Sequence, residues 1–159
     1  MSGGARAAFE TQRTGACGMQ WIDHLRDVDW DELSALYRIA PLGEKSPDYL
    51  RTAFGNSRYV ALVYADGRLV GAGRALADGV DCAYLSDIAV HPQQQGTGLG
   101  KAIVESLVRR AHGHRKILLY ANPGKEGFYL RLGFKRMNTA MAMFADEAAA
   151  LATGVVAAS

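Results

Sequence analysis

The stretch HPQQQGTGLGK, residues 91–101, places three glycines at alternate positions between an expected strand and an expected helix. Glycine that dense costs conformational entropy on folding, so a chain keeps it where a bare backbone is useful. The first N–H groups of a helix have no partner inside the helix, and glycines hold no β-carbons that keep a ligand away. Together with the helix dipole and Lys101, the stretch predicts a cradle for a phosphate or pyrophosphate, and the alternative is a connection that serves packing alone.

Two familiar phosphate loops do not fit this stretch. The nucleotide-triphosphatase loop needs four residues between its glycines and Ser or Thr after the Lys, whereas Ala102 follows Lys101. The dinucleotide fingerprint opens a parallel unit, whereas these glycines alternate and follow what reads as an antiparallel meander. Both therefore fail on spacing and context.

Composition bounds the class of protein. The 159 residues suit one domain, expected over 18–146, between a loose leader at 1–17 and an Ala-rich tail at 147–159. A hydrophobic fraction of 49%, a net charge of +2 and the lack of an apolar run of about 18 residues predict neither a nucleic-acid nor a membrane partner. With no signal peptide visible, we expect a cytoplasmic protein in which Cys17 and Cys82 are free thiols.

Hydrophobic periodicity and turn residues place the elements around the glycines. They predict a helix after Asp29, a second helix from Ser46, a hairpin turn at Asp66 and Gly67, and a helix that follows the glycines and stops at Gly113. Beyond it we expect a buried strand at 115–121, a short helix at 123–133 and a closing hairpin at 134–144.

Two segments carry a family resemblance. DIAVHPQQQGTGLGKAIVESLV resembles the coenzyme-A-binding motif of the GNAT superfamily of N-acyltransferases, whose pattern falls on Gln95, Gly98 and Gly100. LYANPGKEGFYLRLGF resembles the second hallmark of that family, with Asn122, then Phe128 and Tyr129, then Leu132, Gly133 and Phe134. The resemblance implies an α/β (α+β) fold: a mixed, mostly antiparallel sheet of six to seven strands, about four flanking helices, and a parallel strand pair that splays apart at the cofactor site.

The resemblance also implies an activity and a cofactor site. The family moves an acetyl group from acetyl-coenzyme A to a primary amine, by direct attack in a ternary complex. The pantetheine arm is expected to add to the strand at Ile88, Ala89 and Val90, with the Val90 N–H polarising the thioester oxygen. The remaining residues implied in cofactor binding are Gln95, Gly96, Thr97, Gly98, Leu99, Gly100, Lys101, Asn122 and Phe128. Because Gln93, Gln94 and Gln95 are neutral where the family often has basic residues, phosphate binding is expected to rely on the backbone and Lys101.

Tyr129 matches the family tyrosine that protonates the departing thiolate, and its alternative is a packed aromatic residue. Asp87 and Tyr84 are the candidates for the general base, but they alternate across a strand, so at most one faces the cleft. Asp87 is alternatively a brace for a neighbouring loop. Glu44 and Asp48 are either contacts for a cationic substrate or solvated loop charges.

Alternative functions remain open at this point. The leading interpretation is acetylation of a small-molecule amine, since the residue 137–139 turn offers no long loop for grasping a polypeptide. The alternatives are a protein or peptide acetyltransferase, acting on lysine or an N-terminus, and a non-catalytic acyl-coenzyme A-binding module. We expect no metal, because His112 and His114 lack a third ligand at suitable spacing. The apolar AMAMF strand at 140–144 permits a homodimer.

Overall fold

The structure is a computed structural model that describes residues 14–15 and 18–158. The expected leader therefore lies outside the described residues, apart from Thr14 and Gly15, and so does Cys17. The chain forms two compact units, the first ending at Leu118 and the second beginning at Leu119. The single domain at 18–146 stays a prediction.

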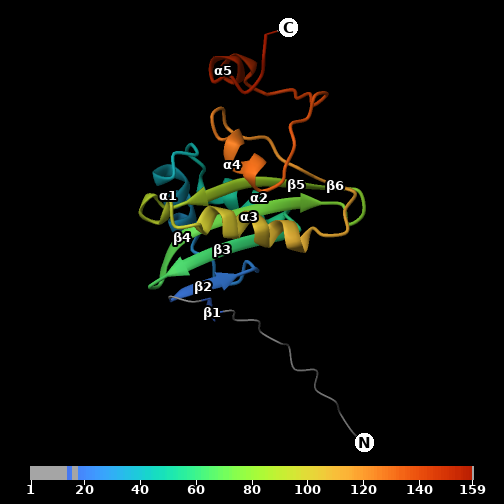
Figure 1. Ribbon diagram of the computed structural model, residues 1–159. Coiled ribbons are helices and arrows are strands. Elements are labelled where there is room, and N and C mark those ends of the chain that lie inside the picture. Colours follow the sequence, from blue (N-terminus) through green and yellow to red (C-terminus); the bar gives the residue numbers. More distant parts are fainter. Residues whose placement is uncertain (1–13, 16–17, 159) are drawn as a thin grey trace, which may run out of the picture. The chain divides into compact units, whose positions relative to one another are not determined.

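The first unit is built on a mixed sheet whose strand order follows the chain (Figure 1). Its strands are β1 (Thr14–Gly15), β2 (Met19–Ile22), β3 (Tyr59–Ala65), β4 (Arg68–Ala77), β5 (Cys82–Val90) and β6 (Lys116–Leu118). Neighbours from β1 to β5 are antiparallel, and β6 is parallel to β5. The predicted turn at Asp66 and Gly67 joins β3 to β4, and both residues have positive φ, as a tight hairpin turn requires.

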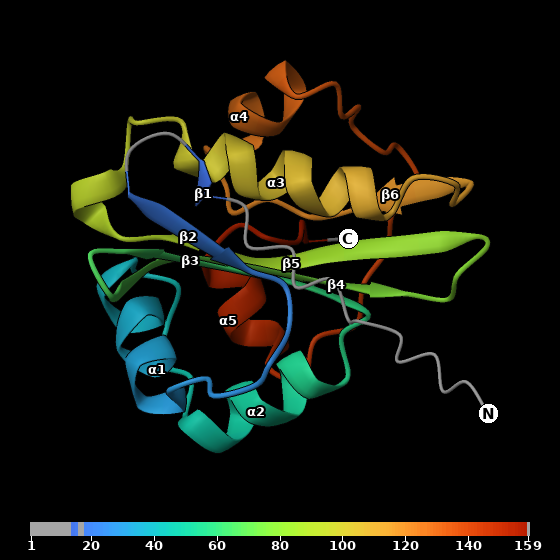
Figure 2. The ribbon, with the colours of Figure 1, turned by 90° about the horizontal axis from the view of Figure 1, so that it is seen from below.

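Helices cover both faces of this sheet. Helices α1 (Trp30–Ile39) and α2 (Pro47–Gly55) lie on one face, and α3 (Leu99–Arg110) lies on the other (Figure 2). The predicted caps are confirmed, because the Asp29 side chain accepts hydrogen bonds from the first turn of α1 and Ser46 does the same for α2.

The core of the first unit lies mainly between α1, α2 and the sheet. Leu33, Tyr37, Leu50, Phe54 and Leu62 are all fully buried there. On the opposite face α3 approaches β4 closely, because two glycines replace side chains at the contact. A Cβ at Gly71 would stand 2.7 Å from Ile103 Cδ1, which is closer than side chains pack.

Three expectations about the sheet are wrong or only partly confirmed. Five strands are longer than two residues, which falls short of the six to seven expected. The strand expected at 115–121 is only three residues long, and the described residues 134–144 form no strand in place of the expected hairpin. Met141 and Met143 in that segment are almost fully exposed, so no packed apolar face is present to hold them in a sheet.

The second unit holds two short helices, α4 (Glu126–Arg131) and α5 (Glu147–Ala152). The short helix expected at 123–133 is thereby confirmed, and part of the Ala-rich tail is helical behind an Asp146 cap. Together with α1, α2 and α3 of the first unit, these make five α-helices among the described residues, where about four were expected. None of the described helices is both long enough and apolar enough to cross a bilayer.

Candidate active site

The parallel pair β5 and β6 leaves half of a strand edge open. Their pairing runs from Cys82 opposite Lys116 to Tyr84 opposite Leu118 and then stops, although β5 continues to Val90. Residues 85–90 therefore have no strand partner on the β6 side within the described part of the chain. The predicted parallel pair is confirmed, and the open edge can accept an extended ligand by β-addition, whereas the splaying of the two strands stays a prediction.

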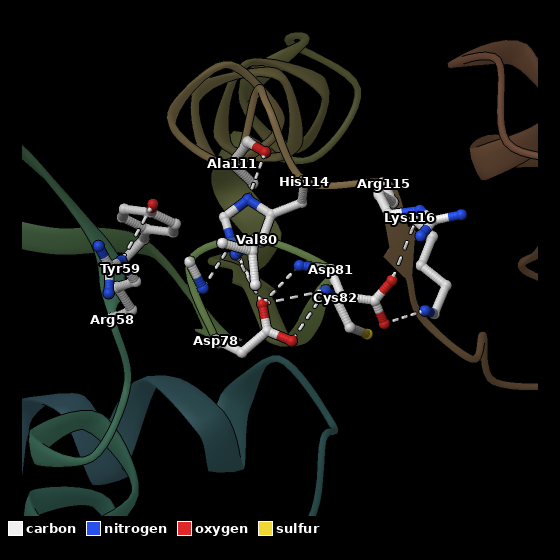
Figure 3. Close-up of polar contacts among 11 residues, drawn as sticks. Arg58, Tyr59, Asp78, Val80, Asp81, Cys82, Ala111, His114, Arg115 and Lys116 are labelled. Atoms are coloured by element: carbon white, nitrogen blue, oxygen red, sulfur yellow. Dashed lines mark hydrogen bonds and ion pairs between the residues drawn. The ribbon is translucent and has the colours of Figure 1, made fainter.

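A polar network joins the start of β5 to the start of β6 (Figure 3). Asp81, just before β5, forms ion pairs with Arg115 and Lys116 at the start of β6, and the Lys116 N–H donates to the Asp81 carbonyl at 2.9 Å. The Asp81 contact raises the pKa of Lys116. His114 adds a second link, since its Nε2 accepts from the Gly79 N–H at 3.1 Å while Nδ1 lies 2.7 Å from the Ala111 carbonyl. The strands are thus joined where they begin.

The main-chain groups of Val90 point out of the open edge. The His91 N–H donates to the Val70 carbonyl of β4 at 2.8 Å. In an antiparallel pair, residues that bond to the partner alternate with residues that do not, so Val90 directs its N–H and C=O away from β4. The Gln95 side chain confirms this direction, because its Nε2 donates to the Val90 carbonyl at 3.2 Å.

The glycine stretch follows directly and forms the predicted turn into α3. Gly96 and Gly98 have φ values of +78° and +90°, which residues other than glycine rarely adopt. A Cβ at either position would meet no atom within 4 Å. Gly98 is the N-cap of α3, and no side chain caps that helix end. The first N–H groups of α3, including those of Leu99 and Gly100, are thereby left for a ligand.

The side chains around this turn carry little charge. Thr97 is used locally, since its hydroxyl donates to the Gln94 carbonyl at 2.6 Å. Lys101 is exposed and lies 3.8 Å from Glu105, so its charge is shared with a neighbouring carboxylate. The cradle therefore offers chiefly backbone N–H groups, as the neutral glutamines predict.

Asp87 occupies an irregular position in β5, just before the open edge. Its φ is +55°, and the pairing of β4 with β5 shifts register across it. Its carboxylate contacts Arg74 and Lys45, and its carbonyl accepts from the Tyr37 hydroxyl. Burial, followed by the Asp87 charge, raises the pKa of Tyr37 well above its usual value, so this hydroxyl remains a donor.

Sequence reasoning missed the three partners of Asp87. Arg74 had a usable signal, because a single charged residue inside the apolar run of β4 must find a buried partner. Lys45 and Tyr37 gave no such signal. Tyr84, the other candidate base, lies on the last paired rung of β5 and β6, opposite Leu118.

Asn122, Phe128 and Tyr129 belong to the second unit. The Asn122 carbonyl accepts from the Lys125 N–H in the turn before α4, and the Phe128 and Tyr129 rings meet edge to face with centroids 5.0 Å apart. Burial raises the pKa of the Tyr129 phenol. Their place beside the open edge of β5 stays a prediction.

One hollow lies outside the predicted site, and no metal-binding group is present among the described residues. A hollow of about 490 Å³ opens on the first unit and contains none of the predicted site residues; it is lined by Trp21, Ile22, Asp23, Val60, Ala61, Ala102, Glu105, Ser106, Arg109 and Arg110. Throughout the described residues no group of three His, Cys, Asp or Glu side chains could hold a metal ion.

Comparison with known proteins assigns the family. Residues 22–134 match the family model for the acetyltransferase (GNAT) family, which is more than half of the chain. The chain belongs to the GNAT family. Its family and the names of its relatives class it with the acyltransferases.

Relatives and solved structures extend the match. The chain is 37% identical over 113 residues to the chloroplastic serotonin N-acetyltransferase 2 of Oryza sativa subsp. japonica, over 67% of this chain and 56% of the relative. It is 34% identical over 124 residues to the histone acetyltransferase TAP1 of Glycine max, over 69% and 53%. The chain thus spans little more than half the length of these GNAT relatives. A putative acetyltransferase from Deinococcus radiodurans R1 shares the fold, with a TM-score of 0.73 and 23% identity over 86% of this chain and 94% of that one.

The expectation of a cytoplasmic protein is wrong by the same comparison. The rice relative and two relatives from Arabidopsis thaliana carry the word chloroplastic in their names, so the matches point to a plastid. Composition and the lack of a visible signal peptide cannot distinguish these compartments, because the folded domain has the same physical requirements in both.

Proposed function

We propose that the chain is an N-acetyltransferase that moves the acetyl group of acetyl-coenzyme A to a primary amine of a small molecule. The observation that carries this proposal is the open edge of β5, where Val90 directs both main-chain groups outward and the strand leads into an uncapped helix N-terminus. Such an edge offers N–H and C=O groups to the amides of a pantetheine arm, and the helix N-terminus offers N–H groups to the pyrophosphate.

Each proposed role falls to a group that suits it chemically. Acetyl-coenzyme A supplies an activated acetyl thioester. The Val90 N–H donates to the thioester oxygen, which gains negative charge during attack by the neutral amine. Tyr129 donates its phenolic proton to the sulfur as the C–S bond breaks, and its raised pKa keeps that proton available.

The proton lost by the amine needs an acceptor, and the two candidates differ in their surroundings. Asp87 already engages two cations, so a proton on its carboxylate would cost those contacts. Tyr84 lies on the last pair between β5 and β6, opposite Leu118. A water chain to solvent is the remaining route for this proton.

The names of the relatives favour two substrate classes. The name of the rice relative contains serotonin, which is a small arylalkylamine. The name of the soybean relative contains histone, a protein that presents lysine side chains. We propose the small amine, since the rice relative is the more similar of these two, at 37% against 34% identity. The second candidate is a lysine of a protein.

Release of coenzyme A thiol, followed with and without acceptor, tests the proposal. The acceptors are serotonin, other primary arylalkylamines, a polyamine and a lysine-containing histone-tail peptide. We expect thiol release that depends on a small amine and an acetylated amine detected by mass spectrometry. Release with the peptide alone supports the second candidate. Tight coenzyme A binding without release in any mixture would identify a non-catalytic binding module.

A further inference from the structure

The direction of the Val90 groups depends on one extra residue in β5. The Asp78 N–H donates to the Cys82 carbonyl at 3.2 Å, so at the start of β5 the even-numbered residues face β4. The His91 N–H donates to Val70, so at its end the odd-numbered residues face β4. Regular alternation cannot produce both directions, because the period of a strand is two residues.

The change of direction takes place at Asp87. Ser86 lies opposite Arg74 and Ala89 lies opposite Ala72, so two residues of β5, Asp87 and Ile88, face the single residue between Arg74 and Ala72 on β4. This is a β-bulge, and Asp87 within it has a φ of +55°. Without the bulge, Val90 would turn its N–H and C=O toward β4 and leave the open edge without them.

Contacts from β4, from α1 and from the loop between α1 and α2 hold Asp87 in this conformation. Arg74 Nε of β4 donates to its Oδ2 at 2.5 Å, and Lys45 Nζ, between α1 and α2, lies 3.5 Å from its Oδ1. The Tyr37 hydroxyl of α1 donates to its carbonyl at 2.5 Å. The side chains of Asp87 and Arg74 are each only 11% exposed, so solvent screens this ion pair little. A left-handed residue other than glycine persists only where its surroundings hold it in this way.

We infer that Asp87 is a positioning residue, which fixes the bulge so that Val90 presents its main-chain groups to the acyl-coenzyme A. This inference rests on the proposed function. It assigns Asp87 to holding the backbone, with Arg74, Lys45 and Tyr37 as its partners, in place of the general-base role. Both carboxylate oxygens already face a cation, which suits a fixed charge better than a proton acceptor.

Amide hydrogen exchange tests the bulge directly and without a ligand. In the parent chain the Ala89 N–H is expected to be protected by β4, while the Val90 N–H exchanges quickly. Asp87→Asn keeps the size of the side chain and the tolerance for positive φ but removes the charge. We expect protection of Ala89 to fall about 10-fold or more in Asp87→Asn. Arg74→Gln, which leaves Asp87 in place, should lower it in the same direction.

Affinity for acetyl-coenzyme A, measured by calorimetry without an acceptor amine, links the bulge to the site, because only the acylated form has the thioester oxygen that the Val90 N–H is proposed to contact. We expect Asp87→Asn and Arg74→Gln each to weaken binding about 3- to 30-fold, equivalent to losing one or two backbone hydrogen bonds to the ligand. The double variant should be no weaker than the worse single one, because both remove the same interaction. Arg51→Gln, which removes an exposed ion pair with Asp48 on α2, is the matched control and should bind as the parent does.

The outcomes separate the possible roles. Asp87→Asn with normal exchange and normal affinity for acetyl-coenzyme A, but a lower kcat and a lost acidic limb in the pH profile, would show a general base and overturn the inference. Unchanged affinity in Arg74→Gln would also overturn it. A lower melting temperature with unchanged exchange and affinity would reduce Asp87 to a structural role. If the parent binds no coenzyme A, the proposed function fails, and the exchange data still decide whether Asp87 controls the bulge.

Discussion

Gly98 offers the sharpest test of the cradle, because its backbone strain and its proposed contact with a ligand can be measured separately. Its φ of +90° disfavours any side chain, at a cost of about 1 to 2 kcal/mol for a residue with a Cβ. No atom lies within 4 Å of that Cβ, so the substitution adds no clash inside the chain. Gly98→Ala should therefore lower the melting temperature by about 2 to 8 °C and leave the fold intact.

Gly67 provides the matched control. It has a φ of +74° in the turn between β3 and β4, also with no atom within 4 Å of its Cβ. Gly67→Ala should lose comparable stability, since the strain is similar. Only Gly98→Ala should weaken the binding of coenzyme A, because only Gly98 lies where the phosphates are expected.

Gly98→Glu adds a negative charge to the same position. A displaced phosphate loses at least two N–H contacts at about 1.5 to 3 kcal/mol each, which predicts a loss of affinity of about 100-fold or more. Calorimetric titration with coenzyme A measures it, and circular dichroism verifies that each variant is folded. Parental affinity in a folded Gly98→Glu protein would refute the assignment of the cradle.

Three further predictions concern catalysis, packing and pH. Tyr129→Phe should lower kcat about 10- to 1,000-fold with little change in KM, measured by thiol release, and an equal kcat would show that Tyr129 serves only packing. Because burial raises the pKa of Tyr129, the parent should keep this proton donor up to about pH 10. Gly71→Ala should destabilise the chain by about 1 to 3 kcal/mol in denaturant unfolding, since its Cβ would stand 2.7 Å from Ile103 Cδ1, and an unchanged midpoint would contradict the close packing of α3. The raised pKa of Tyr37 means that the folded state resists its ionisation, so the contribution of this group to the free energy of unfolding is constant below about pH 10 and falls as the pH rises further. Tyr37→Phe should remove this decline of stability at alkaline pH, and it should cost about 1 to 3 kcal/mol because the Asp87 carbonyl loses its donor.

The local patterns of the sequence predicted the elements of the first unit well. The apolar runs of β3, β4 and β5, the turn at Asp66 and the caps at Asp29 and Ser46 are decided within a few residues of each other, so a window of sequence contains their causes. The glycine turn is equally local, because positive φ at Gly96 and Gly98 follows from residue type.

The features that sequence reasoning missed depend on distant partners. The bulge at Asp87 needs Tyr37 and Lys45 from 50 and 42 positions earlier in the chain, and no pattern within β5 announces it. β6 ends at Leu118, the last residue that pairs with β5, and the alternating AMAMF segment has strand composition but no strand partner among the described residues. The sequence of a single segment indicates its propensity for helix or strand, but it does not indicate which segment will pair with it.

The open half of β5 also affects how the protein behaves without its ligand. A strand edge with unpaired N–H and C=O groups accepts extended segments of any chain, including another copy of the same protein. A ligand that fills this edge competes with such contacts and also stabilises the folded state by mass action. Purification and storage with coenzyme A should therefore keep the protein monodisperse at concentrations where the ligand-free chain self-associates, an effect that light scattering would detect.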